Sequence, residues 1–192
     1  LEGNIGSVTA NGDGTVWLIR NNTIESFNPD RLPAVTSYPL PKEIFTLGQT
    51  LTLVCTKEYV YTASNGNLYR LNRETGQYVP FTSVGGNNCV IRDVVEYNGS
   101  VYVLTHMDGL YECDGDGRIG RYYRLPHEYE KSAGAKELFL DPAGIIWVAT
   151  QSGLLLLDPL TDSTRLLRFD LHYPYSLPNN SVWSIFADPD GG

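Results

Sequence analysis

The chain has 192 residues, with 14 Lys or Arg against 22 Asp or Glu, which gives a formal net charge of −8 at pH 7. Nucleic-acid binding needs a basic footprint and no basic stripe occurs here, so a nucleic-acid partner is excluded and an anionic membrane surface is disfavoured. No apolar run approaches the ~20 residues of a transmembrane helix. No signal peptide is present, the sequence does not begin with Met and it ends in mid-repeat, so we expect a piece cut from a longer protein.

The chain repeats itself about every 44 residues. A β-branched residue followed by an aromatic one stands at the head of an apolar run four times, with the aromatic residue at Trp17, Tyr61, Tyr102 and Trp147. A fifth copy begins at Val182. Periods of roughly 40 to 50 residues with several short strands per repeat are typical of β-propeller blades.

Each repeat predicts the same order of strands. The first is a short alternating run, predicted at 5–10, 51–56, 91–97, 137–141 and 182–188. Turns rich in Asn, Asp, Gly and Pro then lead to the strand with the aromatic residue, whose apolar character suits packing between neighbouring blades. A third strand is predicted at 23–27, 67–71, 110–113 and 154–157, and an outer strand at 77–81, 120–124 and 164–169.

Four antiparallel strands per repeat make a propeller blade, and no segment has convincing helical periodicity. We therefore predict an all-β fold, in which 1–192 form a single β-propeller segment of about four blades plus one extra strand, an incomplete propeller. The blades are expected at about 4–38, 48–83, 90–125 and 136–170, with 180–192 as the start of a fifth. The four blades either close on themselves or form an open arc. An open arc would expose apolar edges, so we expect it to pair with another copy as a homo-oligomer.

Three cysteines, Cys55, Cys89 and Cys113, are an odd number at unrelated spacings, which gives neither a disulfide framework nor a zinc pattern. Cys55 and Cys113 fall inside apolar runs, where a small buried thiol is the expected state. One disulfide with a spare thiol stays open as an alternative.

Two stretches resemble a known family. Residues 176–191 (SLPNNSVWSIFADPDG) and 138–154 (LFLDPAGIIWVATQSGL) look like the junction between two-component regulator propeller repeats. These repeats form the periplasmic sensor region of hybrid two-component histidine kinases of Bacteroidetes. The match is strong over 136–192 and weaker in the first three repeats, which carry Tyr61 and Tyr102 in place of Trp. The resemblance implies a periplasmic location, an oligosaccharide-type signal, and a fragment of a propeller that usually has seven blades.

In a propeller the loops between second and third strands share one face with the segments that join the blades, and function usually lies there. Arg20 and Arg92 are the charges nearest the channel ends of their strands. Either can hold a carboxylate or sulfate bidentately, as in an acidic glycan, or can pair with an Asp of a neighbouring blade.

Further candidate ligand-binding residues lie in the same loops. His106 and Asp108 are candidates for a sugar contact, and ordinary hairpin chemistry is the alternative. Aromatic side chains stack on sugar rings, so Tyr129, Tyr173 and Tyr175 are candidates too. For Tyr173 and Tyr175 the alternative is that they brace one blade on the next.

No catalytic set, metal site or cofactor site is predicted. The loop that contains His106 supplies too few ligands for a metal, and residues 114–117 (DGDG) are expected to form a plain turn because the Glu of a calcium loop is missing. No pair of carboxylates, nucleophile with base, or phosphate loop is present.

The first functional interpretation is a non-catalytic sensor segment of a two-component regulator, which binds a glycan or mediates dimerisation while any kinase lies outside this chain. One alternative is a scaffold whose propeller face binds another protein. The other is an enzyme, a propeller lyase or glycosidase, with its catalytic groups in absent blades.

Overall fold

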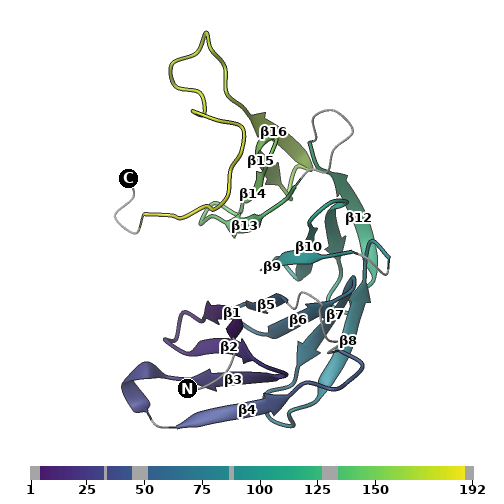
Figure 1. The fold of residues 1–192 in the computed structure, drawn as a ribbon. Coiled ribbons are helices and arrows are strands. Elements are labelled where there is room, and N and C mark those ends of the chain that lie inside the picture. The colour runs from purple at the N-terminus through teal and green to yellow at the C-terminus, as the bar shows by residue number, and fades with distance from the viewer. Residues whose placement is uncertain (1–4, 33, 45–51, 87–88, 127–133, 189–192) are drawn as a thin grey trace. The chain divides into compact units, whose positions relative to one another are not determined.

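The computed structural model describes residues 5–32, 34–44, 52–86, 89–126 and 134–188 (Figure 1). The chain divides into two compact units, Leu1–Ile91 and Arg92–Gly192. In the described ranges the only helix is one 3-10 turn, η1 (Pro29–Arg31), and no helix there is long and apolar enough to cross a membrane. The predicted all-β fold is confirmed, because the strands form four four-stranded antiparallel sheets.

The first unit holds two of these sheets, in the strand orders β1-β2-β3-β4 and β5-β6-β7-β8. Strands β1 and β2 contact β5, so the two sheets lie side by side at their first strands. The strands are β1 (Ile5–Ala10), β2 (Val16–Arg20), β3 (Thr23–Phe27), β4 (Val35–Pro39), β5 (Thr52–Cys55), β6 (Val60–Ser64), β7 (Asn67–Leu71) and β8 (Tyr78–Ser83).

The second unit repeats the same up-and-down arrangement, in the orders β12-β11-β10-β9 and β13-β14-β15-β16. The strands are β9 (Ile91–Tyr97), β10 (Ser100–Thr105), β11 (Gly109–Cys113), β12 (Ile119–Arg124), β13 (Glu137–Leu140), β14 (Ile146–Thr150), β15 (Gly153–Asp158) and β16 (Ser163–Leu167).

Tight turns with positive φ set the register of the hairpins. Asn21, Asn65 and Asn98 have φ of 57°, 50° and 50°, the left-handed conformation that Asn tolerates and hairpin turns demand. Gly66 follows Asn65 at φ 75°, and a Cβ there would collide with the carbonyl oxygen of Val84. That turn therefore requires glycine both for its backbone angle and for the close approach of the chain.

The aromatic residues that define the repeat lie in the cores of the sheets. Trp17, Tyr61 and Tyr102 are each at most 2% exposed, and the ring of Trp17 stacks on Tyr38 with centroids 5.8 Å apart. Trp147 is half-buried, and its indole N–H donates to Asp141 Oδ2 at 2.8 Å. Each unit has its own apolar cluster, in the first built around Ile24, Leu53, Val60 and Leu71, and in the second around Leu104, Leu110, Ile146 and Leu157.

A polar side chain near the start of the first strand ties one repeat to the backbone of the next. Thr52 of β5 donates its hydroxyl to the carbonyl of Ile91, the last residue of the first unit, at 2.6 Å. Asp93 of β9 accepts the N–H of Leu138 at 2.8 Å, and Glu137 of β13 accepts the N–H of Ile185 at 2.9 Å. We call Thr52, Asp93 and Glu137 the linking side chains.

The predicted extra strand is not formed in the structure. Residues 182–188 have no strand partner among the described residues. Instead, Val182 N–H donates to the carbonyl of Thr150 at 2.9 Å, and Ile185 is held by the linking side chain Glu137. The physical reason is that the first strand of a blade pairs with the second strand of its own blade, and the described chain supplies none here. The segment is nevertheless held as β13 is, because the carboxylate of the preceding repeat accepts one of its backbone N–H groups.

No disulfide joins the cysteines. Cys113 is buried, as expected, whereas Cys55 is half-buried. Burial raises the pKa of the Cys55 thiol to about 12, so it stays protonated and unreactive at neutral pH. Residues 114–117 form the expected turn, in which Asp114 Oδ1 accepts the N–H groups of Asp116 and Arg118.

Gly144 and Gly14 close equivalent turns in two repeats and offer a matched pair of substitutions. Both have positive φ, 86° and 81°, but a Cβ on Gly144 would collide with the Tyr97 ring, whereas at Gly14 the nearest atom is 3.8 Å away. Gly14→Ala is expected to lower the free energy of unfolding by about 1 kcal/mol through backbone strain alone. Gly144→Ala should lower the free energy of unfolding by about 1–3 kcal/mol more than Gly14→Ala does, because the half-buried Tyr97 must move. Urea denaturation measures both. Equal losses would show that the contact with Tyr97 is not tight.

The linking carboxylate of Asp93 predicts a pH dependence of stability. Burial raises the pKa of Asp93 to about 6, so between pH 4 and pH 6 the folded chain binds more protons here than the unfolded chain does. Its contribution to stability is therefore largest near pH 4 and falls by on the order of 2 kcal/mol as pH rises to 7. In urea denaturation Asp93→Asn removes this slope. Thr52→Val, which deletes a linking side chain that does not titrate, should lower stability equally at every pH. A slope that persists in Asp93→Asn would contradict the assignment.

Candidate functional site

The second unit carries three side chains at corresponding positions of successive repeats. Arg92 directly precedes the linking side chain Asp93, and Lys136 directly precedes Glu137. Trp183 holds the same place in the C-terminal segment, and the Lys136 ammonium lies 4.2 Å from its ring centroid. We call Arg92, Lys136 and Trp183 the cationic row. Because side chains alternate in direction along an extended chain, the row and the linking carboxylates are directed to opposite sides.

His106 joins this row from the hairpin between β10 and β11. Its Nδ1 lies 3.2 Å from the carbonyl oxygen of Ala135, the residue directly before Lys136, and its own carbonyl accepts the N–H of Ala135 at 3.0 Å. Burial and the nearby charges of Arg92 and Lys136 lower the pKa of His106, and the bond to Ala135 opposes this only in part. The imidazole is thus favoured in its neutral form. Since a carbonyl can only accept, Nδ1 carries the proton and Nε2 is left as an acceptor.

The two cations of the row have no carboxylate partner within ion-pair distance among the described residues. Arg92 Nε is buried and lacks a hydrogen bond in that part of the chain. Trp183 is 68% exposed, so Lys136 covers only part of its ring. The row with His106 therefore combines two positive charges that no described carboxylate pairs with, a neutral acceptor and an open aromatic surface. This set suits an anionic ligand with a sugar-like ring.

Arg20, in the first unit, has its own partner. Its Nε donates to Glu25 Oε1 at 3.1 Å across the hairpin of β2 and β3, and the Glu25 side chain is only 7% exposed. Of the two interpretations that the sequence leaves open, the structure favours charge pairing, although the partner is a Glu of the same blade rather than an Asp of a neighbouring one.

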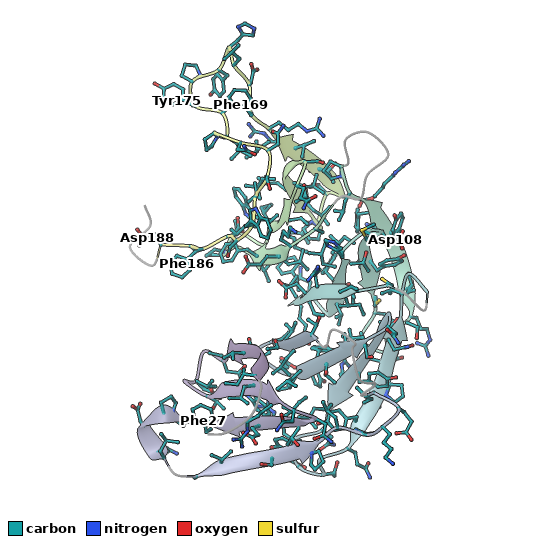
Figure 2. The ribbon with its side chains drawn as sticks, in the orientation of Figure 1. Phe27, Asp108, Phe169, Tyr175, Phe186 and Asp188 are labelled. Atoms are coloured by element: carbon teal, nitrogen blue, oxygen red, sulfur yellow. The ribbon has the colours of Figure 1, made fainter. Side chains whose placement is uncertain are left out.

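Asp108 and His106 are two residues apart in the sequence but have different partners. The Asp108 carboxylate accepts hydrogen bonds from the hydroxyls of Tyr111 and Tyr122, whose rings lie 5.0 Å apart. Figure 2 shows the place of Asp108 in the second unit. Asp108 is thus occupied by tyrosines of β11 and β12. Met107, between the two, is exposed.

Tyr173 and Tyr175 lie on the loop that follows β16, with Tyr175 far out on it (Figure 2). They are 56% and 87% exposed, and their rings meet edge to face with centroids 5.9 Å apart. The loop is closed by its own hydrogen bonds, among them Phe169 N–H to Asn180 Oδ1 at 2.8 Å. Both rings therefore face solvent instead of packing on a sheet. Tyr129 lies outside the described residues.

The sequence analysis named Arg92 and His106 as candidates, a prediction that stays untested, and did not name Lys136 or Trp183. The repeat itself held the signal that finds them, because they occupy the place of Arg92 in the next two copies. Searching each repeat for the residue equivalent to a candidate would have assembled the row.

Comparisons with known proteins show which fold this is. No family model matches the chain, and a search of the curated proteins finds no match either. Among solved structures, the extracellular domain of the hybrid two component system BT4673 from B. thetaiotaomicron matches 98% of this chain with a TM-score of 0.70 and 21% identity. Streptogramin B lyase matches 97% of this chain with a TM-score of 0.73 and 17% identity. Virginiamycin B lyase from Staphylococcus aureus, an inactive variant with quinupristin, matches 88% with a TM-score of 0.68 and 17% identity.

The chain spans only part of each of these proteins, 25% of the BT4673 domain, 60% of streptogramin B lyase and 56% of virginiamycin B lyase. At these identities the likeness shows the fold alone, which is of the propeller type. The resemblance to two-component regulator propellers predicted from the sequence is confirmed as a structural likeness to such a domain.

The coupling within the site can be tested by titrating His106. Lys136→Gln removes a positive charge that lowers the pKa of His106, so that pKa should rise towards the ordinary value. The measurement is an NMR titration of the imidazole Cε1–H resonance from pH 4.5 to 8.5. The control is Arg165→Gln, which removes one positive charge from an exposed residue of β16. It should leave the titration of the His106 resonance unchanged. An unchanged pKa of His106 in Lys136→Gln would show that the lysine does not act on the imidazole and would contradict its place in the site.

Proposed function

We propose that this chain is a non-catalytic, ligand-sensing segment from the extracytoplasmic, periplasmic part of a hybrid two-component regulator. The observation that carries the proposal is the likeness of 98% of the chain to the extracellular domain of BT4673. The acidic net charge agrees with a role that involves neither nucleic acid nor an anionic membrane surface.

The ligand that suits the site is an acidic oligosaccharide. Arg92 and Lys136 supply two positive charges without carboxylate partners in the described ranges, and arginine can hold a carboxylate or sulfate with two parallel hydrogen bonds. His106 Nε2 can accept a hydrogen bond from a sugar hydroxyl. The exposed ring of Trp183 offers an apolar surface for the sugar ring.

Signal transfer in this proposal is a shift between arrangements of paired sensor regions, in a homo-oligomer. A ligand drives such a shift only if it binds the two arrangements with different affinity. The members of the cationic row come from successive repeats, so a shift that also moves those repeats would change their spacing and thereby the affinity for the ligand.

A lyase is the second candidate, because two such enzymes share the fold, one of them with a TM-score of 0.73. The group that favours it is His106, whose neutral imidazole can act as a general base. Against it, the Ala135 carbonyl orients the ring, but no carboxylate of the described chain contacts His106 to stabilise the imidazolium that a general base becomes.

Binding of acidic oligosaccharides tests the proposal directly. We expect a trigalacturonate or a sulfated heparin-type tetrasaccharide to bind, while neutral galactotriose does not bind at this site. Isothermal titration calorimetry measures the affinity, and the fluorescence of the exposed Trp183 reports on the site. Arg92→Gln and Lys136→Gln should each weaken binding about tenfold, as expected for loss of a charged hydrogen bond. Higher salt should weaken it further.

Arg165→Gln serves as the control, since it removes an exposed charge outside the row. Equal binding of acidic and neutral sugars, or full binding by both row variants, would refute the acidic-glycan proposal. Mass spectrometry of the sugars and of added quinupristin after incubation separates sensing from turnover. Conversion of either compound that is lost in His106→Gln would establish the lyase instead.

A further inference from the structure

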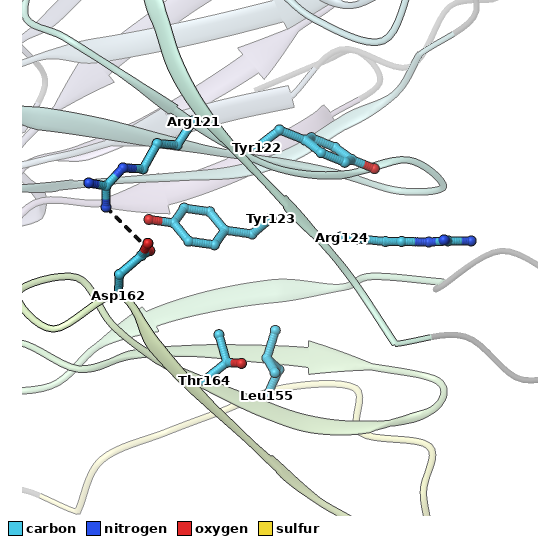
Figure 3. Close-up of a pocket in the computed structure, with 7 residues that line it drawn as sticks. All are labelled: Arg121, Tyr122, Tyr123, Arg124, Leu155, Asp162 and Thr164. Carbon is cyan, nitrogen blue, oxygen red and sulfur yellow. Dashed lines mark ion pairs between the residues drawn. The ribbon is translucent and has the colours of Figure 1, made fainter.

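A second concave site lies in the second unit, between the outer strand β12 and the strands β15 and β16. Its volume is about 540 Å³, within the range of small-ligand sites. Its lining residues are distinct from Arg92, His106, Lys136 and Trp183. Figure 3 shows the residues that line it, Arg121, Tyr122, Tyr123, Arg124, Leu155, Asp162 and Thr164.

An ion pair bridges the two sides of this groove. Arg121 Nη1 of β12 lies 3.3 Å from Asp162 Oδ1, in the turn between β15 and β16 (Figure 3). Asp162 has φ of 58°, and Asp158 holds the turn by accepting the N–H of Leu160 at 2.9 Å. The carboxylate that faces β12 is therefore fixed by its own turn as well as by Arg121.

The hydroxyl of Tyr123 lies beside this pair. It donates to Glu112 Oε2 at 3.1 Å, while Glu112 Oε1 accepts the hydroxyl of Ser100 at 3.0 Å. Burial raises the pKa of Tyr123 to about 12, so the phenol stays protonated and neutral at physiological pH. In Figure 3 the side chains of Arg121 and Tyr123 point towards Asp162, whereas Tyr122 and Arg124 project to the other side of the strand.

The charges in the groove are balanced. Arg121 lies 3.3 Å from Asp162 and 4.0 Å from Glu112, whose carboxylate also accepts the hydroxyls of Tyr123 and Ser100. Arg124 adds a second positive charge at the rim, on the other side of β12. This contrasts with the cationic row, where two cations have no carboxylate partner in the described ranges. A groove with matched charges gives no net attraction to an anion, but it presents fixed donors and acceptors to a neutral molecule.

From this arrangement we infer that the groove binds a neutral saccharide. A sugar hydroxyl both donates and accepts, so one hydroxyl can satisfy Asp162 and another Arg121 or Thr164. The ring of the half-buried Tyr123 supplies apolar surface for the C–H face of a sugar, and the buried Leu155 lies beneath it as part of the lining. The inference does not rest on the proposed function, because it concerns different residues and a ligand of different charge.

The test uses the whole chain with maltotriose, cellotriose, xylotriose and mannotriose as probes. Binding is measured by NMR titration, with the amide resonances of residues 121–124, 155, 162 and 164 as the local report. At least one probe should shift these resonances. Asp162→Asn should weaken its binding about tenfold, because the amide replaces one acceptor oxygen by a donor.

The fold should tolerate Asp162→Asn, since Asn occupies the same left-handed conformation at Asn21, Asn65 and Asn98. Arg121→Lys is a second variant, which keeps the charge but loses the fork of donors, and it should also weaken binding. The control is Asp116→Asn, an exposed carboxylate in the turn before β12, which should bind as the unchanged chain does. No shift with any of the four probes, or undiminished binding by both groove variants, would overturn the inference. Loss of binding in Lys136→Gln would place the sugar at the cationic row instead.

Discussion

The structure depends on how neighbouring repeats are held together when their sheets share no backbone pairing. Within a blade, the strands satisfy their backbone groups by pairing with one another. The first strand pairs only with the second, so the backbone groups on its other edge have no strand partner. The linking side chains Thr52, Asp93 and Glu137 meet this need, because each bonds a backbone group at the start of the following repeat. For Asp93 the arrangement places a carboxyl where burial disfavours its charge, and hydrogen bonds from Leu138 and from its own neighbour Val94 compensate in part.

The links also determine where the candidate site forms. Since side chains alternate along an extended chain, a carboxylate fixed to the next repeat sends the preceding residue to the other side. In the second unit those preceding residues are Arg92 and Lys136, and the C-terminal segment adds Trp183 at the same place. In the first repeat the corresponding residue is Gly6, which has no side chain to contribute. The site is therefore a property of particular repeats and not of the repeat pattern.

The sequence predicted the features that depend on neighbours along the chain. Period, turn residues and aromatic positions identified the four sheets, because hairpin geometry is decided locally by residues such as Asn21 and Gly66. It predicted less well what depends on contacts between repeats. Residues 182–188 have the sequence of a strand but no second strand to pair with among the described residues. His106 and Asp108 are only two residues apart in the sequence, yet one bonds Ala135 and the other bonds tyrosines of β11 and β12. The ion pair of Arg121 with Asp162 joins two repeats and has no sequence signature at all.

The two candidate sites differ in a way that follows from charge and not from shape. The chain carries a formal net charge of −8, so an anionic ligand is repelled at long range and can be held only where positive charge is locally unmatched. Within the described ranges the cationic row meets this condition, and its members come from successive repeats. A ligand that bound all of them would tie those repeats at one spacing, and it would be bound less well at any other. That difference in affinity between arrangements is what a sensor requires, whereas the charge-balanced groove can hold a neutral molecule without opposing the field of the chain.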